Sequence, residues 1–443
     1  MNELRKTYQT GLFLVVLLLL TYSLFGYELE RSNFTKLMIL ITSMFVLTGA
    51  LLYKYKFDFK FLVIISVLFR LVFLFAIPNL SQDFYRFIWD GRMILEGFNP
   101  YIFTPQSFLT AESIPVEQGR ELIDGMGELS AGNFTNYPPL NQLCFALAGL
   151  FAGKSILGSV IVLRILIIGA DLGTLYFGKK LLSKLGLAEY HIFWYLLNPF
   201  IIIELTANLH FEGVMIFFLV WSLYLLHNGK WVWSAILLAL SVSIKLMPLM
   251  FLPLMLQKLR FKSLGYYLIV GLITAATFMP FYNSEFATNF SETIGLWFQK
   301  FEFNGSLYYI AREIGYTFRG YNEIAIIGSY IPYIVILSIL ILALVRKNGK
   351  TQDLITAMML AFTLYLFTST TVHPWYITTL IGLSIFTRYR YPLIWSFLIF
   401  ITYHAYGSDR FHENLWLISL EYIVLILFLT YELFNLKGLK ARI

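Results

Sequence analysis

The sequence predicts an all-α polytopic membrane protein with about 12 to 14 membrane-spanning helices, each needing roughly 20 apolar residues. Of its 443 residues, 58% are apolar and only 13% are charged, which is about half the charged fraction of a typical soluble protein. The apolar residues gather into runs near span length, separated by short polar segments. This composition excludes a disordered chain, a secreted disulfide scaffold and an ordinary cytosolic enzyme. Cys144 is the single cysteine, so an internal disulfide is excluded as well.

The apolar runs give the expected spans in order. The first, Gly11 to Tyr27, is expected to be a span, because it lacks the small-residue cleavage site of a signal peptide. The runs on either side of Pro248 are short, and they form either a half-depth hairpin or one kinked helix. The run 139–153 is too short to span, so we expect a helix in the membrane interface. The predicted spans are residues 9–27, 36–53, 60–78, 156–178, 188–207, 211–227, 230–246, 248–257, 264–280, 324–345, 352–370, 374–387, 391–406 and 415–432.

The basic residues orient these helices. With both termini in the cytoplasm, most Lys and Arg residues fall in short inner segments, as the positive-inside rule requires. The segment 79–138 is rich in Asp and Glu and is placed outside, and 281–323 forms a second outer loop. Treating 139–153 as a full span would move the cluster Lys179–Lys184 outside. The net charge of +7 therefore reflects topology, and we expect no nucleic-acid partner.

The chain is expected to be one integral membrane domain, residues 1–443, because no repeat or soluble domain is evident. Its catalytic half would be residues 60–323 and its C-terminal helical part residues 324–443. We expect it in a bacterial inner or plasma membrane, with the active site on the extracytoplasmic side.

The densest polar segment is Ser81–Arg92, directly after the third predicted span. In a helix, Asp83, Arg86 and Asp90 would share one face, and Trp89 and Arg92 the adjacent face. A carboxylate there could remove a proton from a hydroxyl, arginines could hold phosphate oxygens and aromatic rings could stack on a sugar. An interfacial helix with salt bridges and an aromatic belt would show the same pattern, so both interpretations stay open.

Other polar clusters fall at the outward ends of the predicted spans. Individually, each is also typical of a turn, a solvated loop or an interfacial aromatic anchor, but together they share one membrane side. These clusters are Asn136-Tyr137-Pro-Pro139, Asn208-Leu-His210-Phe-Glu212, Lys245, Phe303-Asn-Gly-Ser306 and His373-Pro-Trp375-Tyr376.

Lys245 is the most informative single position, because it follows about fourteen apolar residues. A lysine at that depth needs an anion or a carboxylate as partner. Arg164 and Asp171 lie on one helix face, which favours polar contacts within the bundle over catalysis. Glu204 lies near the outer end of its span and could face a cavity.

Metal and nucleotide sites are weakly supported. The six histidines form no close ligand pair, and no phosphate-binding glycine loop is present. We expect no cofactor, although a divalent metal is not excluded.

The string Gln82-Asp-Phe-Tyr-Arg-Phe-Ile-Trp-Asp-Gly-Arg92, with Gly97-Phe-Asn-Pro-Tyr101 and Tyr137-Pro-Pro after it, resembles the first outer loop of GT-C glycosyltransferases. It is most similar to the polyprenyl-phosphate-mannose-dependent α-mannosyltransferases of bacteria. The later clusters match that family in order, and the resemblance covers about residues 60–390.

The resemblance implies roles for these residues. A first-loop acid is the expected catalytic base, and Asp83 matches that position, with Asp90 as the alternative. The residues implied in binding the phosphate are Arg86, Arg92, Lys245 and His373. Those implied in binding the sugar and prenyl groups are Trp89, Tyr137, Trp375 and Tyr376. The loop between two spans adds His210 and Glu212 as substrate-binding residues.

We therefore expect a hexosyltransferase, most simply a mannosyltransferase. It would take its sugar from a polyprenyl-phosphate donor, with inversion, and transfer it to a lipid-linked or cell-envelope glycan acceptor. Two other classes remain open: a glycan polymerase or ligase using lipid diphosphate donors, and a secondary transporter, which would need repeated halves around a midplane site.

Overall fold

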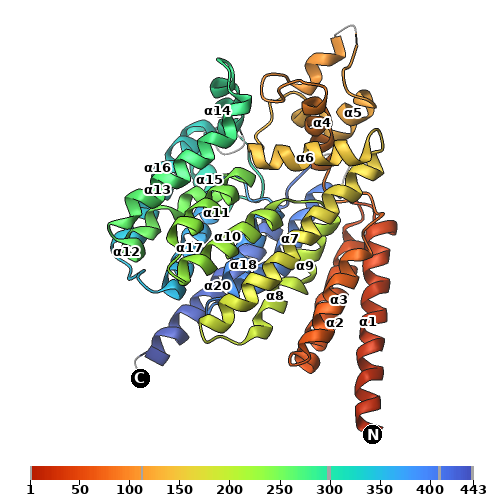
Figure 1. Cartoon of the computed structure of the whole chain (residues 1–443), viewed down its shortest axis with the longest axis vertical. Helices are drawn as coiled ribbons and strands as arrows, with labels where there is room; N and C mark the ends of the chain where they lie inside the picture. Colours follow the sequence, from red (N-terminus) through yellow and green to blue (C-terminus); the bar gives the residue numbers. More distant parts are fainter. Residues whose placement is uncertain (1, 111–112, 297–300, 408–410, 441–443) are drawn as a thin grey trace.

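The computed structural model describes residues 2–110, 113–296, 301–407 and 411–440, and these ranges form a bundle of helices (Figure 1). Within the described ranges, the one β feature is an isolated parallel bridge between Phe303 and Thr371. The predicted fold class, an all-α polytopic membrane protein, is confirmed.

In the part of the chain that the structure describes, seven helices are long and apolar enough to cross a membrane. On most of them many apolar side chains are exposed at the surface of the bundle, as they would be toward lipid, whereas Thr351–Thr368 is 67% buried. They are α1 (Asn2–Glu28), α2 (Phe34–Tyr55), α7 (Ile156–Lys184), α13 (Lys262–Phe278), α16 (Ile324–Leu344), α17 (Thr351–Thr368) and α20 (Leu415–Lys440).

The other predicted spans form shorter or broken helices, so fewer long helices are present than the hydropathy suggested. Proline accounts for several breaks, because it ends the hydrogen-bond ladder of the preceding turn. These elements are α3 (Phe59–Leu71), η2 (Glu189–Ile192), α8 (Phe193–Leu196), α9 (Pro199–Ile201), η3 (Ile202–Ala207), α10 (Glu212–His227), α11 (Trp231–Ile244), η4 (Met247–Phe251), η5 (Pro253–Met255), α12 (Leu256–Leu259), η6 (Met279–Phe281), η8 (Pro374–Tyr376), α18 (Ile377–Ser384), α19 (Tyr391–Leu398) and η9 (Ile399–Tyr406).

The segment around Pro248 is a hairpin. α11 ends at Ile244, the backbone of Lys245 is extended, and η4, η5 and α12 lead the chain back. Trp231, at the start of α11, and Lys258, near the end of α12, line the same surface cavity. The two halves therefore run antiparallel, and of the two alternatives at Pro248 the hairpin is the correct one.

The predicted outer segment packs at one end of the bundle, opposite the two chain termini (Figure 1). It contains α4 (Asp83–Leu95), η1 (Pro105–Thr110), α5 (Gly119–Ala131) and α6 (Pro139–Ala152). The second long loop contributes α14 (Phe286–Gly295) and α15 (Leu307–Arg319). α4 lies so close to α6 that a Cβ on Gly91 would fall 2.1 Å from the carbonyl oxygen of Phe145, so only glycine fits there.

Buried ions join the helices internally. Arg70 Nε on α3 donates to Asp171 Oδ2 on α7 at 2.7 Å, and both side chains are almost fully buried. Arg164 donates to the carbonyl oxygens of Thr206 and Ala207 at 2.8 and 3.0 Å. The expectation that Arg164 and Asp171 make bundle contacts is confirmed.

The chain turns sharply between residues 199 and 227, at a bend of 114°. Asn198 caps α9 by accepting from the Phe200 amide, and η3 then continues as a π-helical turn, a feature often found at functional sites. Leu209 has φ +63°, a left-handed conformation that costs a non-glycine residue on the order of 1–3 kcal/mol. This strained turn presents His210 and Glu212 at the same end of the bundle as α4.

Candidate functional site

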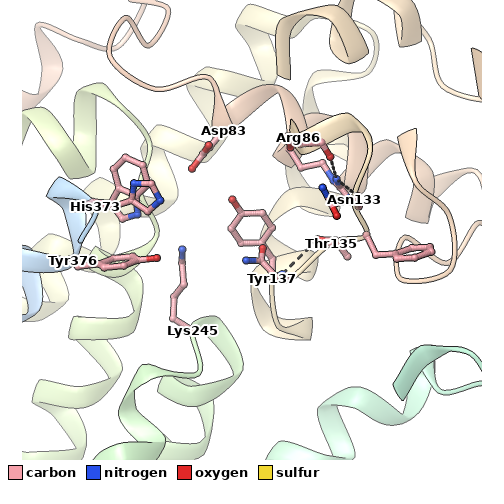
Figure 2. A pocket seen from close by; sticks show the side chains of 12 residues that line it. Asp83, Arg86, Asn133, Thr135, Tyr137, Lys245, His373 and Tyr376 are labelled. Carbon is pink, nitrogen blue, oxygen red and sulfur yellow. Dashed lines mark hydrogen bonds between the residues drawn. The ribbon is translucent and has the colours of Figure 1, made fainter. Parts of the chain in front are cut away.

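A cavity of about 120 Å³ lies between α4, the loop before α6, the end of α11 and the segment formed by His373 and η8 (Figure 2). Asp83, Lys245 and Tyr376 point into it from three of these elements. Four segments distant in the sequence therefore meet at one polar space, and seven of the predicted site residues line it: Asp83, Arg86, Tyr137, Lys245, His373, Trp375 and Tyr376.

Asp83 is the first residue of α4, where the helix dipole favours a negative charge. Its side chain is 33% exposed, and Oδ2 lies 4.0 Å from His210 Nε2. Asp83 is also the only carboxylate among the described residues that line the cavity.

Asp90 has a different environment from Asp83. It is fully buried; Oδ1 accepts from Arg86 Nε at 2.7 Å, and Oδ2 accepts from Gln142 Nε2 at 2.9 Å. Both of its oxygens are therefore occupied within the protein. Of the two aspartates that the sequence left open, Asp83 alone faces the cavity.

Arg86 connects this ion pair to the cavity wall. Its Nη1 donates to the backbone oxygens of Ser130 and Asn133 at 2.7 and 2.9 Å, which holds the loop before Tyr137 in place. Its Nη2 is buried and has no hydrogen-bond partner among the described residues. One guanidinium edge thus remains for an anion.

The counterion that we expected for a lysine at this depth is Glu212. Lys245 Nζ lies 3.0 Å from Glu212 Oε1 at the start of α10, and 5.0 Å from the centre of the Tyr137 ring. Burial and the charge of Asp83 hold the pKa of the Tyr137 hydroxyl well above its usual range. That hydroxyl therefore stays protonated and can donate a hydrogen bond.

Three rings form a stack along one wall. Trp375 lies between His210, at 3.9 Å, and His373, at 4.5 Å between ring centres. Burial, followed by the charges of His210, Lys245 and Arg31, lowers the pKa of His373 to about 3. His373 is thus neutral at pH 7 and can offer a phosphate or sugar a hydrogen bond, but no charge.

The predicted cluster Phe303–Ser306 supports this stack. Phe303 N donates to Thr370 O at 3.1 Å, and Val372 N donates to Phe303 O at 2.8 Å. The Phe303 ring lies 5.2 Å from that of His373. The second outer loop therefore positions the segment that carries His373.

Trp89 and Arg92 do not join the cavity. Trp89 is buried against Phe108, and Arg92 Nη1 donates to Glu117 O at 2.6 Å. Burial also lowers the pKa of Arg92. The reason is the helical repeat, because nine residues at 3.6 per turn place Arg92 about 180° around α4 from Asp83. These two residues hold α4 against the outer segment.

Sequence reasoning missed Arg31, which lies in the turn between α1 and α2. Its guanidinium stacks 3.3 Å from the centre of the Tyr406 ring, and its charge reaches His373. A basic residue in a turn that the charge pattern places outside was the available signal. Among the described residues, no group of three or more His, Cys, Asp and Glu side chains could hold a metal ion.

The polar cavity continues into an apolar groove. A narrow passage of about 60 Å³ shares Tyr137, Lys245 and Tyr376 with the cavity. It shares Leu246, Met247 and Ile294 with a groove of about 510 Å³ between η4, α16 and α17. The groove walls are almost entirely aliphatic, with Val335 and Ile339 of α16 among them.

The chain is similar to two proteins that are named as mannosyltransferases. The chain matches an alpha-(1->6)-mannopyranosyltransferase A of Mycobacterium tuberculosis at 22% identity over 173 residues, 39% of this chain and 32% of the relative. It matches a protein of the same name from Corynebacterium glutamicum at 25% identity over 181 residues, 41% of this chain and 35% of the relative. The match thus spans about a third of the length of these relatives.

The family model described as "Alpha-(1->6)-mannopyranosyltransferase, N-terminal domain" matches residues 25–259, which include α4, α6, α10 and α11. This region holds Asp83, Arg86, Tyr137 and Lys245, but ends before His373. Because the match covers more than half of the 443 residues, the chain belongs to the alpha-(1->6)-mannopyranosyltransferase family.

Proposed function

We propose that this protein transfers mannose from a polyprenyl-phosphate carrier to a hydroxyl group of a glycan or glycolipid acceptor, with inversion at the anomeric carbon. The observation that carries the proposal is the polar cavity, with one open carboxylate and one lysine, joined to an apolar groove. The family and the names of the relatives support mannose as the sugar.

The groove suits the hydrocarbon part of such a donor. Its apolar walls would keep a prenyl chain out of water, and exposing that chain to water would cost roughly 25 cal/mol per Å² of apolar surface. Leu246 and Met247, next to Lys245, line its entrance. A chain lying there would leave its phosphate beside Lys245, at the junction between groove and cavity.

Two cationic groups would receive the phosphate. The ammonium of Lys245 would share its charge between Glu212 and the phosphate, and Arg86 would present its free Nη2. Charge-assisted hydrogen bonds of this kind stabilise a leaving group most as its negative charge grows. The neutral imidazole of His373 and the hydroxyl of Tyr137 would hydrogen-bond neutral parts of the donor.

Asp83 would act as the general base. It would take the proton of the acceptor hydroxyl while that oxygen attacks the anomeric carbon and the phosphate leaves from the opposite face. Among the described residues that line the cavity, Asp83 is the single carboxylate, which favours this one-step displacement, because a two-step reaction would need a second carboxylate as nucleophile.

The topology is compatible with an extracytoplasmic site. Both chain termini lie at the end of the bundle opposite α4 and α6 (Figure 1). We propose that both termini are cytoplasmic and that the cavity opens on the outer face of a bacterial plasma membrane. Cysteine labelling from outside at Asn136, at the cavity, and Lys262, at the far end, would test this orientation, with Cys144 replaced by Ala.

A donor screen tests the function. Purified protein in proteoliposomes is given radiolabelled polyprenyl-phosphomannose, the corresponding glucose donor and a lipid diphosphate sugar, with Asp83→Asn as control. We expect transfer from the mannose monophosphate and loss of at least about 100-fold in Asp83→Asn. Transfer from the diphosphate alone would favour a polymerase or ligase. Sugar movement without a new glycosidic bond would favour a transporter, and full activity of Asp83→Asn would contradict the mechanism.

A further inference from the structure

One ring nitrogen of His210 is buried next to the proposed base and has no partner. Only 1% of the His210 side chain is exposed, and Nε2 makes no hydrogen bond within the described residues. This atom lies 4.0 Å from Asp83 Oδ2. A buried polar atom without a partner is costly, so its direction toward Asp83 calls for a chemical reason.

The other ring nitrogen determines the tautomer. His210 Nδ1 lies 2.8 Å from the backbone oxygen of Glu204 and 3.3 Å from its Oε2. A backbone oxygen can only accept a hydrogen bond, so Nδ1 must carry a proton. In the neutral ring, Nε2 therefore holds the lone pair that faces Asp83.

Two acceptors then face each other. The Nε2 lone pair and the Asp83 carboxylate cannot form a hydrogen bond until a proton arrives between them. Deprotonation of the acceptor hydroxyl delivers such a proton to Asp83. The side chain of Asp83 is one-third exposed and can close the remaining distance, as catalytic contacts often do once substrate is bound.

Glu204 contacts the Nδ1 side of the His210 ring. Its side chain is fully buried on the π-helical turn η3, and Oε1 accepts from the Tyr403 hydroxyl at 2.8 Å. Arg164 binds the next carbonyls of that turn, those of Thr206 and Ala207. A carboxylate held beside an imidazole stabilises its protonated form, and this one has no other ion-pair partner among the described residues.

Resting on the function proposed above, we propose that Glu204 and His210 form a proton-receiving pair behind Asp83. The acceptor O–H bond breaks and its oxygen bonds to the anomeric carbon, while the bond from that carbon to the phosphate oxygen breaks and its electron pair leaves with the phosphate. The proton passes to Asp83 and then to His210 Nε2. Glu204 is a positioning residue that acts through His210. The proton returns through Asp83 to water once the products leave.

The charges around the pair come from several elements. Asp83 faces it from α4, and His373 lies beyond Trp375 in the ring stack. Tyr403 contacts Glu204 from η9, and Arg31 and Tyr406 lie within electrostatic reach of Tyr403. Lys245, paired with Glu212, acts on His373 from the other side of the stack. These groups contribute to the pH dependence, and all of them except Tyr403 stay unchanged in every variant below.

The pH dependence of turnover tests the pair. The variants are Glu204→Gln and, as a matched control, Glu432→Gln. Glu432 is another buried glutamate; it accepts from the backbone of Arg390 and Tyr391, far along α20 from the cavity. The readouts are kcat against pH and KM for polyprenyl-phosphomannose, for folded protein in proteoliposomes.

Glu204→Gln removes the negative charge that helps His210 hold a proton. We expect kcat to fall at least about tenfold, the acid limb of the profile to move down by about one pH unit and KM for the donor to stay within about twofold. Glu432→Gln should keep the unaltered profile. An equal loss at every pH, or an unchanged profile in Glu204→Gln, would overturn the pair while leaving the proposed function intact.

Tyr403→Phe provides a milder second variant in case Glu204→Gln does not fold. The Tyr403 hydroxyl stabilises the charged form of Glu204, so its loss makes the pair bind a proton more readily. The acid limb should then move to higher pH, opposite to the shift in Glu204→Gln. A fixed acid limb in Tyr403→Phe would contradict the proposal. If the unaltered protein transferred no sugar from any polyprenyl phosphate, the proposed function itself would fail and the pair with it.

Discussion

Lys245 Nζ and Glu212 Oε1 lie 3.0 Å apart at the point where the polar cavity meets the apolar groove. The Lys245 side chain is 20% exposed and that of Glu212 is 4% exposed, so the pair is mostly withdrawn from water. An incoming phosphate would have to compete with Glu212 for the ammonium. We therefore expect two roles for the pair: each partner compensates the charge of the other within the protein, and Glu212 limits the affinity of Lys245 for the phosphate of the proposed donor.

These two roles of the pair can be separated by mutation. Lys245→Met should lose donor binding and leave Glu212 buried without a partner, a situation that destabilises proteins by about 3–5 kcal/mol when burial is complete. The double variant Lys245→Met/Glu212→Gln should recover most of the thermal stability but none of the transfer. Thermal unfolding and donor KM are the measurements. Recovery of transfer in the double variant would mean that Lys245 does not hold the phosphate.

The two aspartates of α4 should respond differently to the same change. Asp83→Asn should reduce kcat at least about 100-fold with little loss of stability, because Asp83 is partly exposed and His210 Nε2 lies as far as 4.0 Å from its carboxylate. Asp90→Asn should lower the unfolding temperature by several degrees, because Arg86 would lose its buried counterion. Activity and melting curves are measured on the same preparations of both variants. A greater loss of activity in Asp90→Asn than in Asp83→Asn would indicate that Asp90 is the base.

The apolar groove predicts a dependence on prenyl chain length. Ile339→Trp, at a nearly buried groove position, should raise KM for a long-chain donor at least about tenfold and spare a donor with two isoprene units. Leu337→Trp is the matched control, since Leu337 lies on the same helix but points outward and is 60% exposed. Equal effects of Ile339→Trp on long and short donors would place the prenyl chain elsewhere.

His373 should make the fold sensitive to acid. Its pKa is about 3 in the folded protein, below the value of about 6.5 expected in the unfolded chain, so below pH 6.5 the unfolded state binds more protons. This contribution to stability is fully present above pH 6.5 and is lost as the pH falls toward 3.

At pH 4.5 the loss should amount to about 1–2 kcal/mol, because partial exposure to the cavity reduces the full effect of the shift. The measurement is thermal unfolding at pH 7 and pH 4.5 in detergent. His373→Gln should lose less stability between the two pH values than the unaltered protein. An identical loss would mean that His373 does not remain neutral.

Much of the fold and half of the site follow from the sequence. Composition and runs of apolar residues predict helices in a membrane, and the depth of Lys245 predicts a counterion, which the structure identifies as Glu212. The position of α6 outside the set of spans was also predictable, because 14 residues are too few to cross a bilayer.

The remainder could not be predicted, since it depends on long-range packing. Helical spacing alone cannot decide which side of α4 faces the cavity, and so Arg92 was expected in the site, although it lies against Glu117. The helix changes to the π-helical turn that carries Glu204, but η3 contains no proline or glycine from which this turn could have been predicted. Arg31 acts on His373 only because a short turn lies beside η9, a contact between distant parts of the chain.

The parallel bridge between Phe303 and Thr371 has a consequence for biogenesis. Asp83 and Lys245 come before the segment that carries His373 and Trp375 in the chain, so they are synthesised before it. Until then the ring stack has no centre, and the bridge that supports it cannot form. A nascent or prematurely released chain would therefore hold the base without its surroundings. Such a chain would lack the wall of the cavity that His373, Trp375 and Tyr376 form.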